Sequence, residues 1–242
     1  DVPSRAPSLI PTTLPTSTSL AWQALRSLYE ATGGKEAWLT KTNWMTMSPC
    51  TNSWYGVTCE GSGEYSNFDH VLHLKLERNR LTGTLPTEIG ELTDIISHFM
   101  LNDNSLMSTI PTEIGRIRKL KQSLWFYSNE LTGTIPSEVG EMRHLSGKMY
   151  LHGNALSQAI PTELGLLTNI TEQMILDSNS FTSTIPTELG SLSLISRQFQ
   201  LASNKLSSAI PTQLGKLTAM QSRFFLNENK LSPAGLVDNT GM

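Results

Sequence analysis

Charged side chains are scarce in this sequence and nearly balanced in sign. Asp, Glu, Lys and Arg make up 16% of the 242 residues, against roughly 25% in an ordinary soluble domain. The 18 Lys and Arg against 21 Asp and Glu give a formal net charge of −3. Because nucleic-acid binding depends on Lys and Arg that neutralise phosphates, this balance argues against a nucleic-acid partner. It also argues against electrostatic attachment to a membrane surface.

Long apolar runs and catalytic motifs are also missing. No apolar run approaches the roughly 20 residues of a membrane-spanning helix, so we expect no membrane span in this chain. The sequence begins at Asp1 without a charged-then-apolar leader, which is typical of a processed or cloned mature form. There is no GxSxG, no HExxH and no Gly-rich phosphate loop, so we expect neither an enzyme nor a bound cofactor.

Cysteine is limited to Cys50 and Cys59. Their number and close spacing favour one local disulfide in an oxidising compartment. Two free thiols, or half of a metal site, remain alternatives. The four-ligand zinc patterns need a second Cys or His pair at short spacing, which this sequence lacks, so we expect no metal site.

A repeat of 25 residues organises most of the chain. The apolar-Pro-x-x-x-Gly tracts begin at Leu85, Ile110, Ile135, Ile160, Ile185 and Ile210. An Asn recurs with the same step at Asn79, Asn104, Asn129, Asn154, Asn179, Asn204 and Asn229. Alternating residues before each Asn, such as Leu124 and Phe126, predict a short strand with those side chains inward, and the Pro predicts a short helical or 3₁₀ turn. Each unit is therefore one turn of a solenoid that cannot bury its apolar face alone.

These residues resemble the leucine-rich repeat family, in its plant-type subclass with LTGxIPxELG after the Asn. Leu131 to Gly140 reads LTGTIPSEVG, and the resemblance covers seven repeats from Phe68 to about Leu236. It implies an α/β repeat fold: a right-handed solenoid with a parallel β-sheet on its concave face and a helical cap at its amino terminus. The family unit has about 24 residues. The extra residue before each strand is expected to bulge the strand entry and alter the curvature.

The ends of the solenoid have their own signals. An apolar helical face is expected on Leu20, Ala24, Leu25, Leu28 and Tyr29. The Cys50 to Cys59 segment, ending WYGVTC, resembles the amino-terminal cap of plant-type ectodomains, and this resemblance supports the disulfide and secretion. We expect a Ser/Thr/Pro-rich linker or stalk over 1–19, the cap over 20–66, and seven repeats over 67–242 with the last truncated.

The outward positions of the predicted strands form the candidate binding surface. Coils in such a sheet lie about 4.8 Å apart, so outward aromatic and apolar side chains would form one patch with Asp177, Asn102, Lys148 and Gln173 on its rim. Exposed aromatic clusters usually mark binding surfaces. The expected ligand-binding residues are Met100, Trp125, Tyr127, Tyr150, His152, Ile175 and Asp177. The alternative is lateral packing, or cover by a neighbouring chain or the stalk.

Other columns have simpler interpretations. His73 and His98 share a column and could approach a metal, but solvated histidines are commoner. A Glu column that includes Glu88 could hold calcium, but first-turn carboxylates are favoured by the helix field. Asn169 begins the only N-glycosylation sequon, and we expect a glycan there. Thr columns that include Thr84 and Thr87 resemble the flat faces of ice-binding solenoids, although Ala and Ser interrupt them.

The resemblance extends to polygalacturonase-inhibitor-like proteins and receptor ectodomains, whose work is recognition. It implies an extracellular module, secreted or at the cell surface, that binds a protein, a peptide or a polysaccharide. A structural cell-wall or adhesion protein is the main alternative, and an ice-binding solenoid is the weaker one. A hydrolase or lyase that uses His152 and Asp177 is the enzymatic rival.

Overall fold

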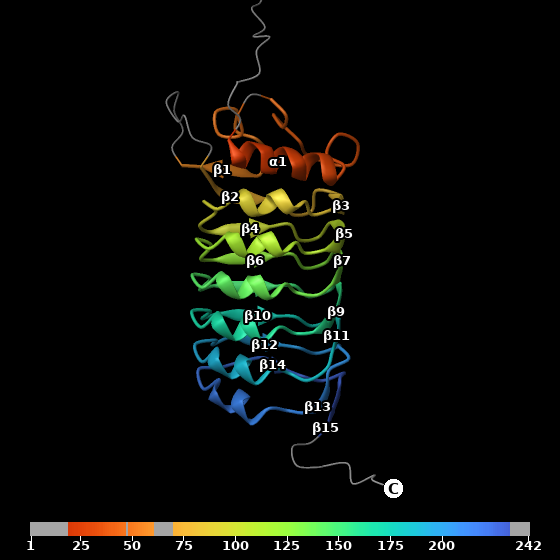
Figure 1. Ribbon diagram of the computed structural model, residues 1–242, viewed down its shortest axis with the longest axis vertical. Helices are drawn as coiled ribbons and strands as arrows, with labels where there is room; N and C mark the ends of the chain where they lie inside the picture. Colours follow the sequence, from red (N-terminus) through yellow and green to blue (C-terminus); the bar gives the residue numbers. More distant parts are fainter. Residues whose placement is uncertain (1–18, 47, 61–69, 233–242) are drawn as a thin grey trace, which may run out of the picture.

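The computed structural model describes residues 19–46, 48–60 and 70–232. In these ranges the chain forms a stack of similar coils, with one helix lying across its amino-terminal end (Figure 1). The expected linker over 1–19 falls almost entirely outside the described residues, as do positions 61–69 between cap and repeats and the end of the last repeat. No described helix is long and apolar enough to cross a membrane.

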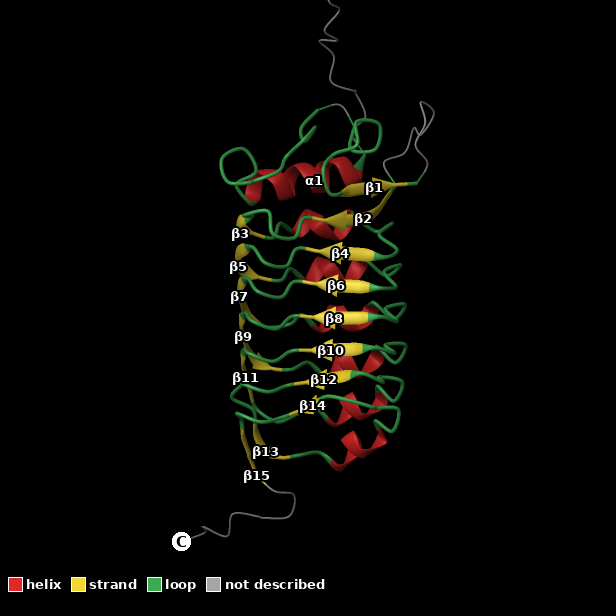
Figure 2. Ribbon diagram, turned by 180° about the vertical axis from the view of Figure 1, so that it is seen from behind, coloured by secondary structure: helices red, strands yellow, loops and turns green. Residues whose placement is uncertain are grey.

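The main sheet has eight strands, one from the cap and one from each of seven coils (Figure 2). β1 pairs antiparallel with β2, and every later pair is parallel. The strands are β1 (Val57–Cys59), β2 (Val71–Lys75), β4 (His98–Met100), β6 (Ser123–Trp125), β8 (Lys148–Tyr150), β10 (Gln173–Ile175), β12 (Gln198–Gln200) and β14 (Phe224–Phe225). Equivalent positions of successive repeats pair directly, as His73 does with His98. The predicted parallel sheet is thus confirmed.

A second set of strands runs along one edge of the stack. The strands are β3 (Thr82–Thr84), β5 (Ser105–Thr109), β7 (Glu130–Gly133), β9 (Ala155–Ala159), β11 (Ser180–Thr182), β13 (Ser207–Ala209) and β15 (Lys230–Ser232). Here Thr82 pairs with Ser105 and Thr132 with Ala155. The partners are therefore two positions out of the repeat register, unlike those of the main sheet.

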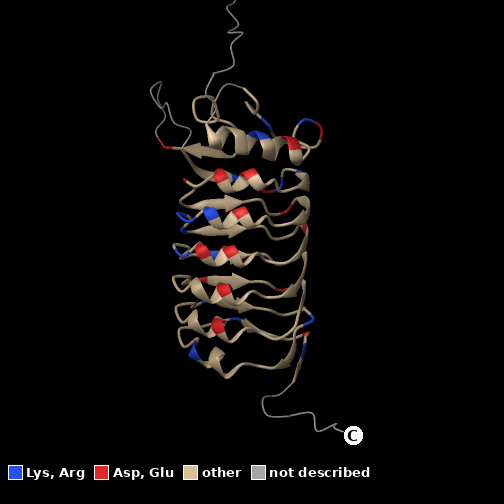
Figure 3. Ribbon diagram, viewed as in Figure 1, with Lys and Arg blue, Asp and Glu red and all other residues tan. Residues whose placement is uncertain are grey.

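Short 3₁₀ helices close each coil opposite the main sheet, each beginning after a Pro. They are η1 (Thr87–Glu91), η2 (Thr112–Arg116), η3 (Ser137–Glu141), η4 (Thr162–Leu166), η5 (Thr187–Ser191) and η6 (Thr212–Lys216). Pro at this position already has the backbone angle that the turn needs. Acidic residues lie on several of these helices, and Lys and Arg residues gather at the neighbouring turns (Figure 3).

The core is a stack of inward side chains inside the coils. Leu124 and Phe126 are 2% and 1% exposed, as predicted, and the Phe126 ring meets Phe99 edge to face at 5.0 Å between centroids. The repeated Asn completes the backbone pairing at the turn. Asn104 donates through Nδ2 to the carbonyls of Leu76 and Leu101, both at 2.9 Å, and its Oδ1 accepts from the backbone of the preceding coil. Buried backbone groups that the turn leaves unpaired are thereby satisfied.

The extra residue of each repeat lies where the chain enters the main sheet. The N–H groups of Ser146 and Gly147 both donate to the carbonyl of Lys121, at 2.7 and 3.0 Å, and Arg197 and Gln198 share the carbonyl of Glu172 in the same way. Two residues opposite one define a β-bulge. The coils still stack almost parallel to one another along the molecule (Figures 1 and 2).

The cap is built on α1 (Leu20–Ala31), whose first turn is capped by the Ser19 hydroxyl accepting from the Trp22 N–H at 3.1 Å. The expected helix is present, but one part of its predicted apolar face is wrong. Leu20 is 60% exposed, and Trp22 is buried instead. Leu20 is the first helical residue and its side chain stays in solvent, whereas Trp22 reaches Trp54 at 6.4 Å between ring centroids. The expected disulfide joins Cys50 to Cys59, with their Cα atoms 5.5 Å apart.

Candidate functional site

Four rings form a stacked cluster on the outer face of the main sheet, which we call the aromatic patch: Trp125, Tyr127, Tyr150 and His152. Trp125 lies parallel to Tyr150, with 5.3 Å between centroids and 8° between planes. Tyr127 lies parallel to His152 at 4.6 Å and 6°. Tyr127 meets Tyr150 edge to face at 6.0 Å, which ties the two stacks together.

The repeat register produces this stacking. Trp125 on β6 pairs with Tyr150 on β8, and the Ser128 N–H donates to the His152 carbonyl at 2.9 Å just beyond the strands. Neighbouring strands lie about 4.8 Å apart, so equivalent outward rings on successive coils must lie nearly face to face. Offset and edge-to-face ring pairs are favourable arrangements. The rings therefore hold one another in a fixed arrangement.

Met100 and Ile175 were expected to extend the exposed patch on either side. The structure puts them in the predicted column, where Met100 pairs with Trp125 and Ile175 with Tyr150. However, they are only 9% and 8% exposed. The expectation of exposure is wrong for these two side chains, because the packing of the stacked coils leaves almost none of their surface open. They support the patch from its two ends and contribute little surface to it.

Charged and amide side chains border the aromatic patch on the side where the chain enters the strands. Lys148 Nζ lies 5.9 Å from the Trp125 ring centroid and 3.6 Å from Glu172 Oε2, which also meets Arg197 at 3.8 Å. The Tyr150 hydroxyl donates to Gln173 Oε1. Burial, together with the Glu172 charge, raises the pKa of Tyr150 to about 12. Tyr150 is therefore a neutral hydrogen-bond donor at physiological pH.

Polar atoms without hydrogen-bond partners are concentrated on the same face. Within the described residues, buried side-chain atoms of this kind comprise Trp54 Nε1 in the cap and, on the main sheet, His73 Nδ1, Glu77 Oε2, Asn102 Oδ1, Trp125 Nε1, His152 Nδ1 and Asp177 Oδ1. Asn102 is 2% exposed. Buried polar groups in native proteins nearly always have partners, so a face that gathers such atoms is a candidate contact surface.

Asn102 was expected on the rim of the patch, whereas no binding role was predicted for Glu77. Both occupy the outward column of Tyr127, His152 and Asp177. Their place in this column was therefore enough to predict both residues as part of the candidate binding surface. Whether a polar atom finds a partner depends on side-chain rotamers and on neighbouring coils, which the repeat pattern does not specify.

His152 and Asp177 lie next to each other on successive coils, and His152 Nδ1 and Asp177 Oδ1 both lack a hydrogen-bond partner. Burial lowers the pKa of His152 below its ordinary 6.5, although the Asp177 and Asp103 charges oppose the shift. The imidazole is therefore mostly neutral at pH 7. Asp177 accepts a hydrogen bond at 3.0 Å from the Ser178 hydroxyl through its other oxygen.

The remaining candidates lie elsewhere and do not join the patch. His73 and His98 approach at 5.5 Å between ring centroids, and burial lowers the pKa of both. The described residues contain no group of three or more His, Cys, Asp or Glu able to hold a metal. In the Glu column, Glu88 Oε2 accepts from the Thr87 hydroxyl at 3.3 Å. Asn169 is exposed, and its amide donates to the Arg143 carbonyl at 2.7 Å.

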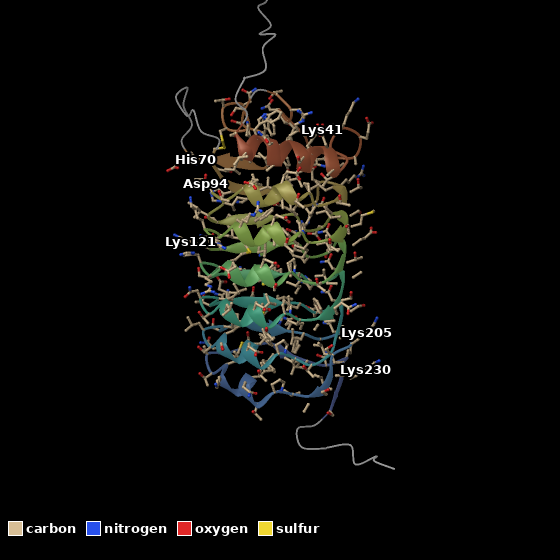
Figure 4. All side chains as sticks on the ribbon, viewed as in Figure 1. Lys41, His70, Asp94, Lys121, Lys205 and Lys230 are labelled. Carbon is tan, nitrogen blue, oxygen red and sulfur yellow. A yellow bond between two sulfur atoms is a disulfide. The ribbon has the colours of Figure 1, made fainter. Side chains whose placement is uncertain are left out.

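An edge network lies at the turns that lead into the main sheet. Asp94 Oδ1 meets Lys119 Nζ at 2.6 Å, and its Oδ2 meets His70 Nδ1 at the same distance. His70 and Asp94 lie together at one edge of the stack, with Lys121 further along it (Figure 4). The hydrogen bond from Lys119, aided by His70, lowers the pKa of Asp94 despite its partial burial. This network links successive turns and lies outside the aromatic patch.

We compared the chain with protein-family models, with curated proteins and with solved structures. No protein-family model matches the chain. A leucine-rich repeat receptor-like serine/threonine-protein kinase of Arabidopsis thaliana is 37% identical over 51 residues, which is 21% of this chain and 5% of that protein. The repeat ectodomain of the Arabidopsis thaliana receptor kinase GASSHO1/SCHENGEN3, solved with CASPARIAN STRIP INTEGRITY FACTOR 2, is 26% identical with a TM-score of 0.59. That match covers 89% of this chain and 30% of the ectodomain.

Two further solved structures match over most of their own length. Pollen Receptor Kinase 3 is 22% identical with a TM-score of 0.69, covering 88% of this chain and 97% of that one. A plant ice-binding protein is 20% identical with a TM-score of 0.54, covering 87% and 86%. Identities this low show a shared fold alone.

The fold and the repeats together define a leucine-rich repeat solenoid. Within that class, the chain with its disulfide-bonded cap is similar to the plant-type ectodomains of receptor kinases. The chain spans only a small part of the kinase that it matches in sequence.

Proposed function

We propose that this chain is an extracellular recognition module that binds a peptide or a protein segment on the outer face of its main sheet. The observation that carries the proposal is the aromatic patch, with unpartnered polar atoms around it. The proposed module consists of the cap over 20–66 and the repeats over 67–242, preceded by a linker over 1–19.

The patch is suited to binding because it is both apolar and rigid. Four rings stacked across two coils offer their surface without needing to be ordered on contact. Binding therefore costs less side-chain entropy than it would on a flexible surface. Large aromatic side chains near the centre of an interface commonly contribute most of its binding free energy.

The unpartnered atoms favour a polypeptide as the ligand. Trp125 Nε1 is a donor, whereas Asn102 Oδ1, Glu77 Oε2 and Asp177 Oδ1 are acceptors. They lie on the first three coils and on the fifth. A peptide in extended form presents N–H and C=O groups at short intervals, so it can meet both kinds. The ectodomain of GASSHO1/SCHENGEN3 was solved with a bound factor, which supports a protein or peptide ligand. A polysaccharide ligand receives no such support.

Extracellular placement rests on the disulfide and on the neighbours. Disulfides persist in oxidising compartments, and the cap is closed by the Cys50–Cys59 bond. On this proposal Asn169 is available to a glycan, because the side chain is exposed and lies away from the main sheet face. Mass spectrometry of protein from a secreting eukaryotic host tests that site.

A selection from a random linear dodecapeptide phage library tests the proposal. Peptides selected on the wild-type chain are expected to lose about 30-fold or more in affinity for Trp125→Ala and Tyr150→Ala, since each truncation removes about 2 kcal/mol. Tyr55→Ala, at an exposed cap ring, is the matched control. A library that yields no binder, or binders that tolerate both patch variants, contradicts the proposal.

An ice-binding function is a second candidate, favoured by uncharged Thr columns on the flank. Thr84, Thr109 and Thr134 are exposed along the second set of strands. Inhibition of ice recrystallisation that is lost in Thr109→Lys and kept in Trp125→Ala would support this candidate over peptide recognition.

Catalysis can be tested with the purified protein. Turnover of a peptide or a glycan that is lost in His152→Ala would contradict the proposal that the chain only binds its ligand.

A further inference from the structure

Asp177 is a carboxylate on the sheet face without a countercharge. The ion pairs in the described part of the chain join other residues, and none includes Asp177. Its Oδ1 is covered and has no hydrogen-bond partner, whereas its Oδ2 accepts only from Ser178. A partly desolvated charge without a partner is unfavourable. A cation supplied by a bound partner would remove that penalty.

The nearest titratable neighbour does not supply this cation. His152 lies on the preceding coil, and burial lowers its pKa, so its ring is mostly neutral at pH 7. Asp103, the other carboxylate that acts on His152, already has Arg78 at 3.3 Å. Arg197, on the strand-entry side, is paired with Glu172 at 3.8 Å. The acidic character at Asp177 is therefore unopposed by its surroundings.

The aromatic rings next to Asp177 suit the stem of a long side chain. Ala202 occupies the same column on the next coil, where the Ser178 N–H donates to the Ala202 carbonyl at 3.0 Å. The Ala202 side chain is a methyl group that is only 8% exposed, and it supplies neither a charge nor a hydrogen bond to the carboxylate. On the other side of Asp177, the half-buried rings of Tyr150 and His152 meet edge to face at 5.8 Å between centroids and form an apolar wall. Lys and Arg lay their aliphatic stems on apolar surface while the charged end seeks a partner.

We propose that the partner places a Lys or Arg side chain against Asp177, with its stem along the Tyr150 and His152 rings. This inference rests on the proposed function and names the ligand chemistry of that same face. The aromatic patch anchors the partner, and Asp177 selects partners with a basic residue at one fixed distance from that anchor.

The peptides selected on the wild-type chain test this inference. They are expected to share a basic residue at one position relative to an aromatic or apolar anchor. Asp177→Asn should weaken such a peptide about tenfold or more, since close charge pairs across interfaces couple by at least 1.4 kcal/mol. Replacing the basic residue by norleucine or citrulline should weaken the peptide on the wild-type chain by a similar factor.

A double-mutant cycle separates the pair from general electrostatics. The neutral peptide should bind Asp177→Asn and the wild-type chain within about twofold, because the partner charge is gone from both. Asp103→Asn, which removes a nearby paired carboxylate, is the matched control and should change affinity by less than about threefold. Melting curves of each variant confirm that it is folded.

The outcomes distinguish the two proposals. Peptides that lose affinity in Trp125→Ala but bind Asp177→Asn as tightly as the wild-type chain overturn this inference alone. The inference is also overturned if the affinity losses from Asp177→Asn and from the neutral peptide simply multiply in the double-mutant cycle, because the two groups are then not coupled. A selection without binders, or with binders indifferent to Trp125→Ala, contradicts the proposed function and this inference together.

Discussion

At the scale of single residues, alternate positions of one strand have opposite roles. Leu124 faces the core and Trp125 faces outward in the structure. The same chain segment therefore contributes to the core on one side and to the proposed recognition surface on the other. A shift of one residue would exchange these faces completely, which makes the pair a direct test of the strand's orientation.

We expect Leu124→Ala to lower the free energy of unfolding by about 2–5 kcal/mol, as core truncations do. Trp125→Ala should lower it by about 1 kcal/mol or less, since it loses ring stacking but opens no cavity in the core. Urea unfolding followed by circular dichroism measures both. Equal losses would show that the ring is part of the core.

Three histidines on the main sheet make stability depend on pH. Burial lowers the pKa of His73, His98 and His152 below 6.5. Lys75 lowers it further at His73 and His98, whereas Glu77 opposes the shift at His98, and Asp177 and Asp103 oppose it at His152. The unfolded chain therefore binds protons at higher pH than the folded chain does.

Stability from these groups is fully present above about pH 6.5 and is lost as pH falls through the lowered values. We expect the free energy of unfolding to fall between pH 7.5 and pH 5, and His152→Gln to reduce that fall. The exposed His144→Gln serves as control and should leave it unchanged. A free energy of unfolding that rises over this range would contradict the burial of these rings.

At the scale of elements, the sequence predicted one sheet and missed the other. The alternation before each Asn, as at Leu124 and Phe126, is strong enough to predict the main-sheet strands. The second set of strands lacks such alternation, because residues such as Thr82 and Ser157 are small and polar. Those strands exist because stacked coils bring their backbones together, and the tertiary arrangement decides this rather than local propensity.

The aromatic patch, too, could be predicted only in part from the sequence. The 25-residue repeat placed Trp125 and Tyr150 in one column, and the register confirmed it. The repeat could not show that Met100 and Ile175 are covered, because cover depends on side-chain size and rotamers on both neighbouring coils. Nor could it show which polar atoms, such as Asp177 Oδ1, lack partners.

A left-handed backbone position in the second set of strands gives a further prediction. Gly133 has φ 72°, and an added Cβ would lie 2.7 Å from Thr109 Cγ2. The equivalent Ser183 has φ 66°. Gly133→Ala should cost about 1–2 kcal/mol of stability, whereas Ser183→Gly should add about 0.5–1 kcal/mol after the entropy of Gly is counted. Thermal melts that show the opposite order would exclude backbone strain at this position.

At the scale of the whole molecule, each coil touches only its neighbours, so stability is distributed along the stack. In such proteins a local change weakens nearby repeats more than distant ones. The two ends of the stack differ in how far their apolar side chains are covered from solvent. α1 and the disulfide cover the first coil, whereas Phe224 and Phe225 in the last described strand of the main sheet are 39% and 44% exposed.

Reduction of the Cys50–Cys59 bond tests this distribution. Opening a loop of this length should cost the cap about 2–3 kcal/mol, and amide exchange should accelerate in α1, β1 and β2. Strands β10 and β12 should keep their exchange rates, because several intact coils lie between them and the cap. Hydrogen exchange measured by mass spectrometry with and without reductant follows both regions, and Cys50→Ser/Cys59→Ser should match the reduced wild type. Uniform acceleration along the stack would instead show that the solenoid unfolds as one cooperative unit, with the cap as an essential part of it.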